Sequence, residues 1–175
     1  MTYVTVSAIK DKPSVTSNWQ PVSAPLAGVE IVRTRHVVTR NGLTTELFRS
    51  DWPETGYDAR HVMINRWEKP LVTDWHCHRQ QADHISVLTG RILIGLYDDR
   101  PESSSSGQSM VLRCDWADPQ TVVIPAGIFH SFKVLVAPAL MLNTITHTYK
   151  YDDPDHWRLT GEGKKQIPLD LSLLE

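Results

Sequence analysis

Three histidines and two carboxylates lie within the seventeen residues from Asp74 to Gly90. If this stretch enters a strand, alternate side chains point to opposite faces of the sheet. His76 and His78 then share one face, and Cys77 points to the other. Two imidazoles close together on one face are half of a metal site.

A second stretch supplies another histidine. Pro125 and Gly127 predict a tight turn, and His130 follows near the start of the next strand. The side chains that share a face with His130 are apolar, so we expect His130 to point into the interior. In the earlier strand the same alternation places Asp83 inward and His84 outward, where His84 is a surface or supporting residue.

The four inward groups are His76, His78, Asp83 and His130. Three neutral imidazoles and one carboxylate suit a divalent ion such as Zn, Fe, Mn or Ni, with positions left for water or substrate. A lone carboxylate in an apolar interior costs many kcal/mol, so it needs a partner. Two interpretations stay open, a metal centre or a polar cluster that holds no ion. No organic cofactor is expected.

The elements that position these groups are short strands at regular spacing, which indicates an antiparallel sandwich or barrel. Asn41-Gly42 predicts a hairpin. A short helical turn is expected only near 155–158. Strands are expected at 29–38, 43–49, 61–67, 71–78, 83–88, 91–97, 109–114, 121–124, 128–136 and 139–148.

The chain of 175 residues predicts one domain, 29–175, with an irregular C-terminal extension and an N-terminal arm, 1–28, that packs on a neighbour or is a plain tail. A net charge of −2 argues against a nucleic-acid or membrane partner. We find no signal peptide, and two cysteines favour free thiols in a cytoplasmic protein.

The two stretches resemble the paired motifs of the cupin superfamily. The first motif is His-x-His, then a carboxylate, then glycine, as in His76, His78, Asp83 and Gly90. The second is Pro-x-Gly-x-x-His, which begins here at Pro125. The resemblance implies an all-β jelly-roll fold, the double-stranded β-helix barrel of cupins. Asp83 departs from the usual glutamate by one methylene.

Residues 28–170 are similar to the dTDP-4-keto-6-deoxyhexose 3,5-epimerases. The similarity follows the order of a hairpin with Glu46, the His76 region, the loop at 98–100, the turn at Pro125 and Tyr149 before Asp-Pro. It implies a homodimer and a metal-free reaction, in which a histidine removes the proton beside the sugar ketone and a tyrosine donates one.

His76 matches the position of the family's base, and Glu46 matches the hairpin that holds the nucleotide base. Two positions depart from the family. The phosphate-binding arginine of Arg-Gly-Leu-His is absent from the run that begins at Thr73, and Asn143 stands where the tyrosine is expected. Asparagine cannot act as a general acid, although Asn143 can hydrogen-bond a ligand.

We therefore expect an isomerase or epimerase that acts beside the carbonyl of a small molecule, such as a sugar nucleotide or a related carbohydrate. The catalytic candidates are His76 and Asn143. A metal-dependent dioxygenase and a non-catalytic binding protein are the alternative hypotheses. Substrate contacts are expected from Glu46, Arg66, Trp75, Phe129 and Asn143. Trp75 and Phe129 can instead be packing residues. Arg79 and Lys133, like Arg66, either meet an anionic substrate or are solvated charges, and Tyr149 either packs within the fold or lies at the barrel mouth.

Overall fold

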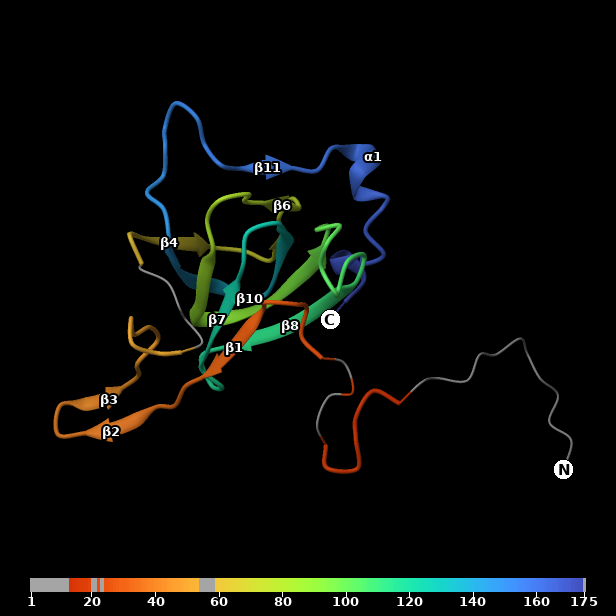
Figure 1. Ribbon diagram of the computed structural model, residues 1–175. Coiled ribbons are helices and arrows are strands. Elements are labelled where there is room, and N and C mark those ends of the chain that lie inside the picture. The colour runs from red at the N-terminus through yellow and green to blue at the C-terminus, as the bar shows by residue number, and fades with distance from the viewer. Residues whose placement is uncertain (1–12, 20–21, 23, 54–58, 175) are drawn as a thin grey trace, which may run out of the picture.

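A computed structural model describes residues 13–19, 22, 24–53 and 59–174 (Figure 1). Nearly all of its regular structure is β-strand. No helix within the described ranges is long and apolar enough to cross a membrane.

Two long strands form the centre of the fold. β7 (Asp83–Asp98) and β10 (Ile128–Ile145) run antiparallel and pair along nearly their whole length. Both bend at the same level, where the register shifts between Val134 and Met141 opposite Gly90. Each strand therefore contributes one half to each side of the jelly roll.

The remaining strands extend these two halves. β9 pairs with the first half of β7, and β8 pairs with its second half. β4 pairs with the second half of β10, while β5 and β6 pair with its first half. The bounds are β1 (Glu30–Arg33), β2 (Val37–Thr39), β3 (Gly42–Thr44), β4 (His61–Trp67), β5 (Leu71–Val72), β6 (His76–Cys77), β8 (Ser109–Asp115), β9 (Gln120–Ile124) and β11 (Trp157–Arg158).

Apolar side chains fill the interior between the halves. Ile85, Ile92, Ile94, Leu96 and Ile128 are almost fully buried in this core. The strands alternate as expected, with one set of side chains directed to the core. Both cysteines are buried free thiols.

The predicted strands are confirmed in place but differ in length. The pairs 83–88 with 91–97 and 128–136 with 139–148 are each one continuous bent strand, because β7 and β10 stay paired through the bend. The predicted strand 71–78 is instead interrupted between β5 and β6.

The hairpin at Asn41-Gly42 is present but shorter than predicted. β2 and β3 have three residues each and stand out from the main sheet (Figure 1). The residues predicted to extend the first arm form β1, which separates from the hairpin because it pairs with β9.

The C-terminal segment crosses one end of the barrel. β11 pairs with β6 in the place where a helical turn at 155–158 was predicted, so that prediction was wrong. The pairing supplies strand hydrogen bonds that the local sequence does not signal. A short helix, α1 (Gly161–Lys164), and a 3₁₀ turn (Leu171–Leu173) follow, and Ile167 and Leu171 are buried against the outer face.

Candidate functional site

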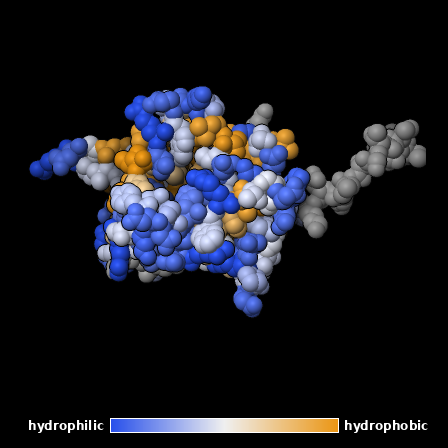
Figure 2. All heavy atoms as spheres, turned by 90° about the horizontal axis from the view of Figure 1, so that it is seen from above, coloured by the Kyte–Doolittle hydropathy of each residue, from blue (hydrophilic) through white to orange (hydrophobic). Residues whose placement is uncertain are grey.

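A cavity of about 900 Å³ opens at the end of the barrel that the C-terminal segment crosses. Figure 2 looks down on this end, where patches of hydrophobic residues interrupt a mostly hydrophilic face. β4 and the second half of β10 supply one wall, and β6, β7 and the first half of β10 supply the polar floor. The wall residues are Met63, Asn65, Trp67, Met141, Asn143 and Ile145.

His76, His78 and His130 meet on the floor of this cavity. Each offers one ring nitrogen, and the three nitrogens lie within 4.8 Å of one another. His76 and His130 are opposite each other in the pairing of β6 with β10. His76 and His78 both face the cavity, as the alternation of side chains predicted, although β6 ends at Cys77.

The three imidazoles are held in the same tautomer. Nδ1 of each ring faces a backbone carbonyl oxygen, that of Asp74 for His76, of Asp155 for His78 and of Ile128 for His130. A carbonyl oxygen only accepts hydrogen bonds, so Nδ1 carries the proton and Nε2 keeps its lone pair. Such backbone contacts commonly orient histidines that bind metals.

Asp83 completes the cluster from β7. Its Oδ2 lies 3.6 Å from His78 Nε2 and 3.5 Å from His130 Nε2, and its side chain is almost fully buried. Gln81 Nε2 donates to its Oδ1 at 2.8 Å. One carboxylate oxygen is thus supported by an amide, and the other faces the imidazole nitrogens.

The surroundings of His76 and His130 favour their neutral forms. Burial and, after it, the neighbouring histidines lower the pKa of His76 to about 2. Burial and His78 lower the pKa of His130 to about 3. A neutral imidazole has no proton to lose before it binds a cation.

These residues fit a divalent metal ion. His130 Nε2 is buried without a hydrogen-bond partner among the described residues, which is costly unless a cation or a ligand satisfies it. Three imidazole nitrogens and one carboxylate are the donor set that Zn, Fe, Mn and Ni accept.

Asn143 faces the cluster across the cavity. Its side chain is mostly buried, and its Oδ1 has no hydrogen-bond partner within the described ranges. A buried amide with free hydrogen-bonding capacity can bind a polar atom of a substrate. Tyr149 also lines the cavity, which places it at the barrel mouth as expected.

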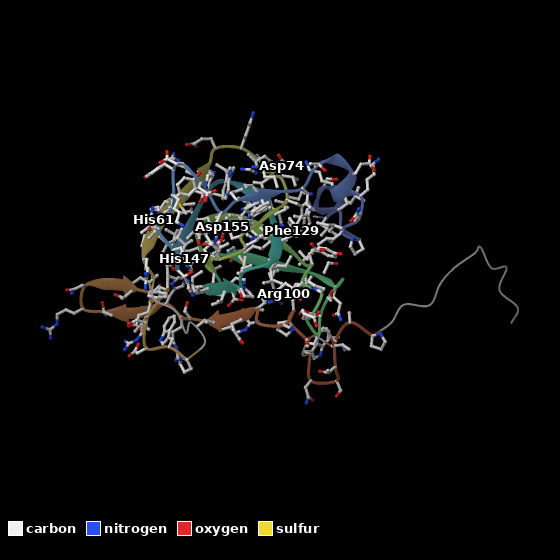
Figure 3. The ribbon with its side chains drawn as sticks, turned by 45° about the horizontal axis from the view of Figure 1, so that its top comes forward. His61, Asp74, Arg100, Phe129, His147 and Asp155 are labelled. Atoms are coloured by element: carbon white, nitrogen blue, oxygen red, sulfur yellow. The ribbon has the colours of Figure 1, made fainter. Side chains whose placement is uncertain are left out.

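Four residues expected to contact substrate lie outside the cavity. Trp75 and Phe129 are the neighbours of His76 and His130 in sequence, so they point to the opposite face, where they pack with Leu171. This placement agrees with a packing role for both side chains, and their contact with substrate stays a prediction. Figure 3 shows Phe129 on its strand.

Arg66 and Glu46 are also outside it. Arg66 lies between two cavity residues of β4 and therefore points outward, where it is exposed and pairs with Glu68. Its contact with substrate stays a prediction that this placement does not support. Glu46 is exposed, pairs with Arg49 and lines a separate open groove beside the hairpin. Its role toward the nucleotide base stays a prediction.

His84 points away from the cavity as predicted, but it is not a surface residue. It is almost fully buried, with Nδ1 3.0 Å from the carbonyl oxygen of Thr144 and the ring of Phe48 against its edge. The segment that carries Phe48 packs over this face of the sheet. Strand alternation alone does not predict that another segment buries the outward face.

His156 is the cavity residue that the sequence did not indicate. Its ring stacks on His76, with centroids 4.3 Å apart and planes 9° from parallel. Its Nε2 is buried without a partner within the described ranges. It lies in an irregular segment rich in aspartate and proline, where no periodicity assigns a side chain to a face. The only feature of the sequence that could have indicated a role in the site was that the residue is a histidine.

The fold and the polar cavity define a jelly-roll cupin. A family model described as dTDP-4-dehydrorhamnose 3,5-epimerase matches residues 23–161. The chain belongs to this epimerase family, and it is an enzyme of the epimerase class. The resemblance seen in the motifs is confirmed.

Two curated relatives match most of the chain. The "Probable low-salt glycan biosynthesis epimerase Agl13" of Haloferax volcanii is 34% identical over 122 residues, which cover 69% of this chain and 78% of the relative. The spore coat polysaccharide biosynthesis protein SpsL of Bacillus subtilis is 30% identical over 136 residues, covering 75% and 87%.

Solved structures confirm the fold at lower identity. A dTDP sugar isomerase from Desulfovibrio desulfuricans superimposes with a TM-score of 0.76 at 19% identity, covering 86% of this chain and 94% of that one. The RmlC epimerase of Mycobacterium tuberculosis gives a TM-score of 0.73 at 17% identity, covering 85% and 76%.

Proposed function

We propose that the chain epimerises or isomerises a sugar that carries a ketone, by moving a proton at the carbon beside the carbonyl. The family and the names of the two curated relatives, both of glycan or polysaccharide biosynthesis, support this substrate class. The observation that carries the proposal is the cavity itself, where neutral imidazoles and a free amide face the same space.

In this proposal, His76, His78, Asp83 and His130 hold a divalent ion. The ion supplies Lewis-acid polarisation of the substrate carbonyl when it is bound. The support is the convergence of three unprotonated nitrogens beside a buried carboxylate.

Asn143 accepts a hydrogen bond from a hydroxyl group of the sugar through Oδ1, the atom that has no partner within the described ranges. This contact orients the sugar beside the imidazoles. The family's tyrosine is absent at this position, so Asn143 binds and orients but transfers no proton.

The proton acceptor is a group outside the ion's donor set, because a coordinated nitrogen cannot also take a proton. His156 is the imidazole that meets this condition. It lines the cavity, contacts His76 and has a buried Nε2 with no partner in the described part of the chain.

A second mechanism has its own support. His76 matches the position of the family's catalytic histidine, so in an ion-free site His76 itself is the base. The two mechanisms exclude each other, because one nitrogen of His76 cannot serve both roles. They share the same overall reaction and differ in their dependence on a metal.

Solvent exchange tests the function. We expect the protein to incorporate deuterium from D₂O into dTDP-4-keto-6-deoxyglucose beside the ketone, measured by proton NMR. Treatment with EDTA abolishes the exchange, and one of Zn, Fe, Mn or Ni restores it. His156→Asn lowers the exchange rate by about 10²–10⁴ while metal content is kept, since that is the usual contribution of a general base.

Arg66→Gln is the matched control and leaves the exchange rate unchanged, because this side chain points away from the cavity. Full exchange after metal removal, lost in His76→Asn, contradicts the ion and establishes the second mechanism. No exchange with nucleotide-linked or free 4-keto sugars contradicts the proposed function.

A further inference from the structure

A second pocket adjoins the histidine cavity at its mouth. It has a volume of about 380 Å³ and lies between the residues before β4, the turn after His78 and the segment 147–157. The two spaces share Gln81, Tyr149, Pro154 and Asp155 as lining residues. A molecule that lies in the second pocket can therefore extend into the first.

The cations of this pocket are available to a ligand. Arg60, Arg79 and Lys150 line it, and none of them forms an ion pair within the described part of the chain. The carboxylates that line it are Asp153 and Asp155. Three positively charged side chains thus line the pocket beside two carboxylates. One of these carboxylates, Asp155, already accepts several hydrogen bonds.

Asp155 is committed to the backbone. Its carboxylate accepts hydrogen bonds from the backbone N–H groups of residues 79, 80 and 81 at 2.9, 2.7 and 3.3 Å. The indole N–H of Trp157 donates to it at 3.1 Å. These bonds engage both carboxylate oxygens, so Asp155 organises the turn after His78 and forms no ion pair with an arginine in the described part of the chain.

Aromatic side chains form the rest of the wall. The guanidinium carbon of Arg79 lies 3.6 Å from the ring centroid of Trp157, which fixes the arginine without satisfying its N–H donors. Tyr149 and Trp157 are 41% and 47% exposed, unusually open for such side chains. Cations beside accessible rings suit a ligand with phosphates and a planar base.

The opposite end of the cavity has a different character. Asp74 lies there, in the run where the family carries its phosphate-binding arginine, and pairs with Lys164. Arg158 also lines that end, with Asp74 close enough for its charge to act on the carboxyl. In Figure 3, His147 and Asp155 lie together on one side, and Asp74 lies apart toward α1.

We propose that the pocket of Arg60, Arg79 and Lys150 binds the diphosphate of a nucleoside diphosphate, with the base against Tyr149 or Trp157. The sugar attached to the diphosphate then reaches the histidine cavity past Gln81 and Pro154. This inference rests on the proposed function, and it places the phosphates on the Asp155 side of the cavity rather than at the run beginning with Thr73.

Calorimetric titration of the full chain with dTDP tests the pocket, with inorganic pyrophosphate and thymidine as the two partial probes. We expect dTDP to bind more tightly than either part. Arg79→Gln and Lys150→Gln each weaken dTDP binding about tenfold, the usual effect of losing one charge-assisted hydrogen bond. The Lys150 side chain forms no hydrogen bond or ion pair within the described residues, so its replacement leaves the fold intact even if Arg79→Gln loosens Trp157.

Arg66→Gln and Arg158→Gln are the controls, one outside both spaces and one at the opposite end of the cavity. Unchanged binding in Lys150→Gln, or loss of binding in Arg158→Gln alone, overturns the proposal, as does a wild-type protein that binds no dTDP. Weakened dTDP binding in the pocket variants supports the proposed phosphate site even if no sugar undergoes solvent exchange. Absence of exchange contradicts only the proposed function.

Discussion

The histidine cluster shows how much chemistry depends on which ring nitrogen carries the proton. Backbone carbonyl oxygens accept hydrogen bonds from Nδ1 of His76, His78 and His130, so three lone pairs remain on Nε2. Burial and, after it, the neighbouring histidines lower the pKa of His76 and of His130. A divalent cation satisfies the three lone pairs and the Asp83 carboxylate together.

Metal binding is the first prediction at this scale. A saturating divalent ion at about 100 times its dissociation constant stabilises the folded state by about 2.7 kcal/mol. For a domain of this size, that raises the melting temperature by about 5–10 °C. We expect the rise with at least one of Zn, Fe, Mn and Ni, measured by thermal unfolding and reversed by EDTA.

The variants Asp83→Asn and His130→Asn lose the rise, whatever their own melting temperatures. His147→Asn is the matched control and keeps it, because His147 is exposed and lies outside the cluster. An equal rise in His130→Asn and wild type shows that the ion binds elsewhere, and this result contradicts the metal site.

The sequence predicted this cluster because three of its members lie on strands and His78 directly follows one. Alternation places His76, His78, Asp83 and His130 on inner faces, and the spacing of the two motifs brings the strands together. It could not predict His156, whose position depends on β11 pairing with β6 across the end of the barrel. It also could not tell that Trp75 packs beneath the C-terminal segment, because that contact is long-range.

At the scale of the elements, the bend shared by β7 and β10 decides the shape of the barrel. Gly90 has φ +75° at this bend, and a Cβ there would lie 2.4 Å from the carbonyl oxygen of Val136 and 2.8 Å from Ala139. The sequence located Gly90 but predicted a turn between two strands. Glycine permits both, and only the continuous pairing with β10 distinguishes a bend from a turn.

Gly90→Ala is therefore expected to destabilise the protein by about 2–5 kcal/mol. About 1–2 kcal/mol comes from a left-handed backbone with a Cβ, and about 1–3 kcal/mol comes from overpacking against Val136 and Ala139. The free energy of unfolding in urea measures the loss.

Gly107 provides the matched comparison, because it has φ +76° with nothing within 4 Å of a Cβ. Gly107→Ala has only the backbone cost of about 1–2 kcal/mol. The difference between the two variants isolates the close approach of the strands. Equal losses would mean that β10 moves aside, and the bend would then not depend on this contact.

Across the whole molecule, one buried carboxylate joins segments that are far apart in sequence. Asp98 accepts hydrogen bonds from Nε of Arg100 at 2.9 Å and from the hydroxyls of Ser103 and Ser105 at 2.5 and 2.6 Å. Arg100 Nη2 also donates to the carbonyl oxygen of Ala27 at 2.6 Å. The loop after β7 thus anchors the end of the N-terminal segment.

This network makes the stability of the fold sensitive to acid. Burial alone would raise the pKa of Asp98, but the bonds from Arg100, Ser103 and Ser105 outweigh it and lower the pKa. A carboxyl whose pKa is lower in the folded state stabilises the fold above its unfolded pKa of about 3.9, and this contribution is lost as the pH falls below that value. We expect the free energy of unfolding to decline from about pH 5 downward.

Asp98→Asn removes part of that decline and lowers stability near neutral pH by about 1.5–3 kcal/mol, the usual contribution of hydrogen bonds to a charged group. Asp118→Asn is the control, because its pair with Arg33 is exposed, with 74% of the aspartate side chain accessible. Its effect stays within about 0.5 kcal/mol at every pH. Urea unfolding between pH 2 and 7 separates the two carboxylates, and parallel curves for wild type and Asp98→Asn would show that other acidic groups set the acid limit.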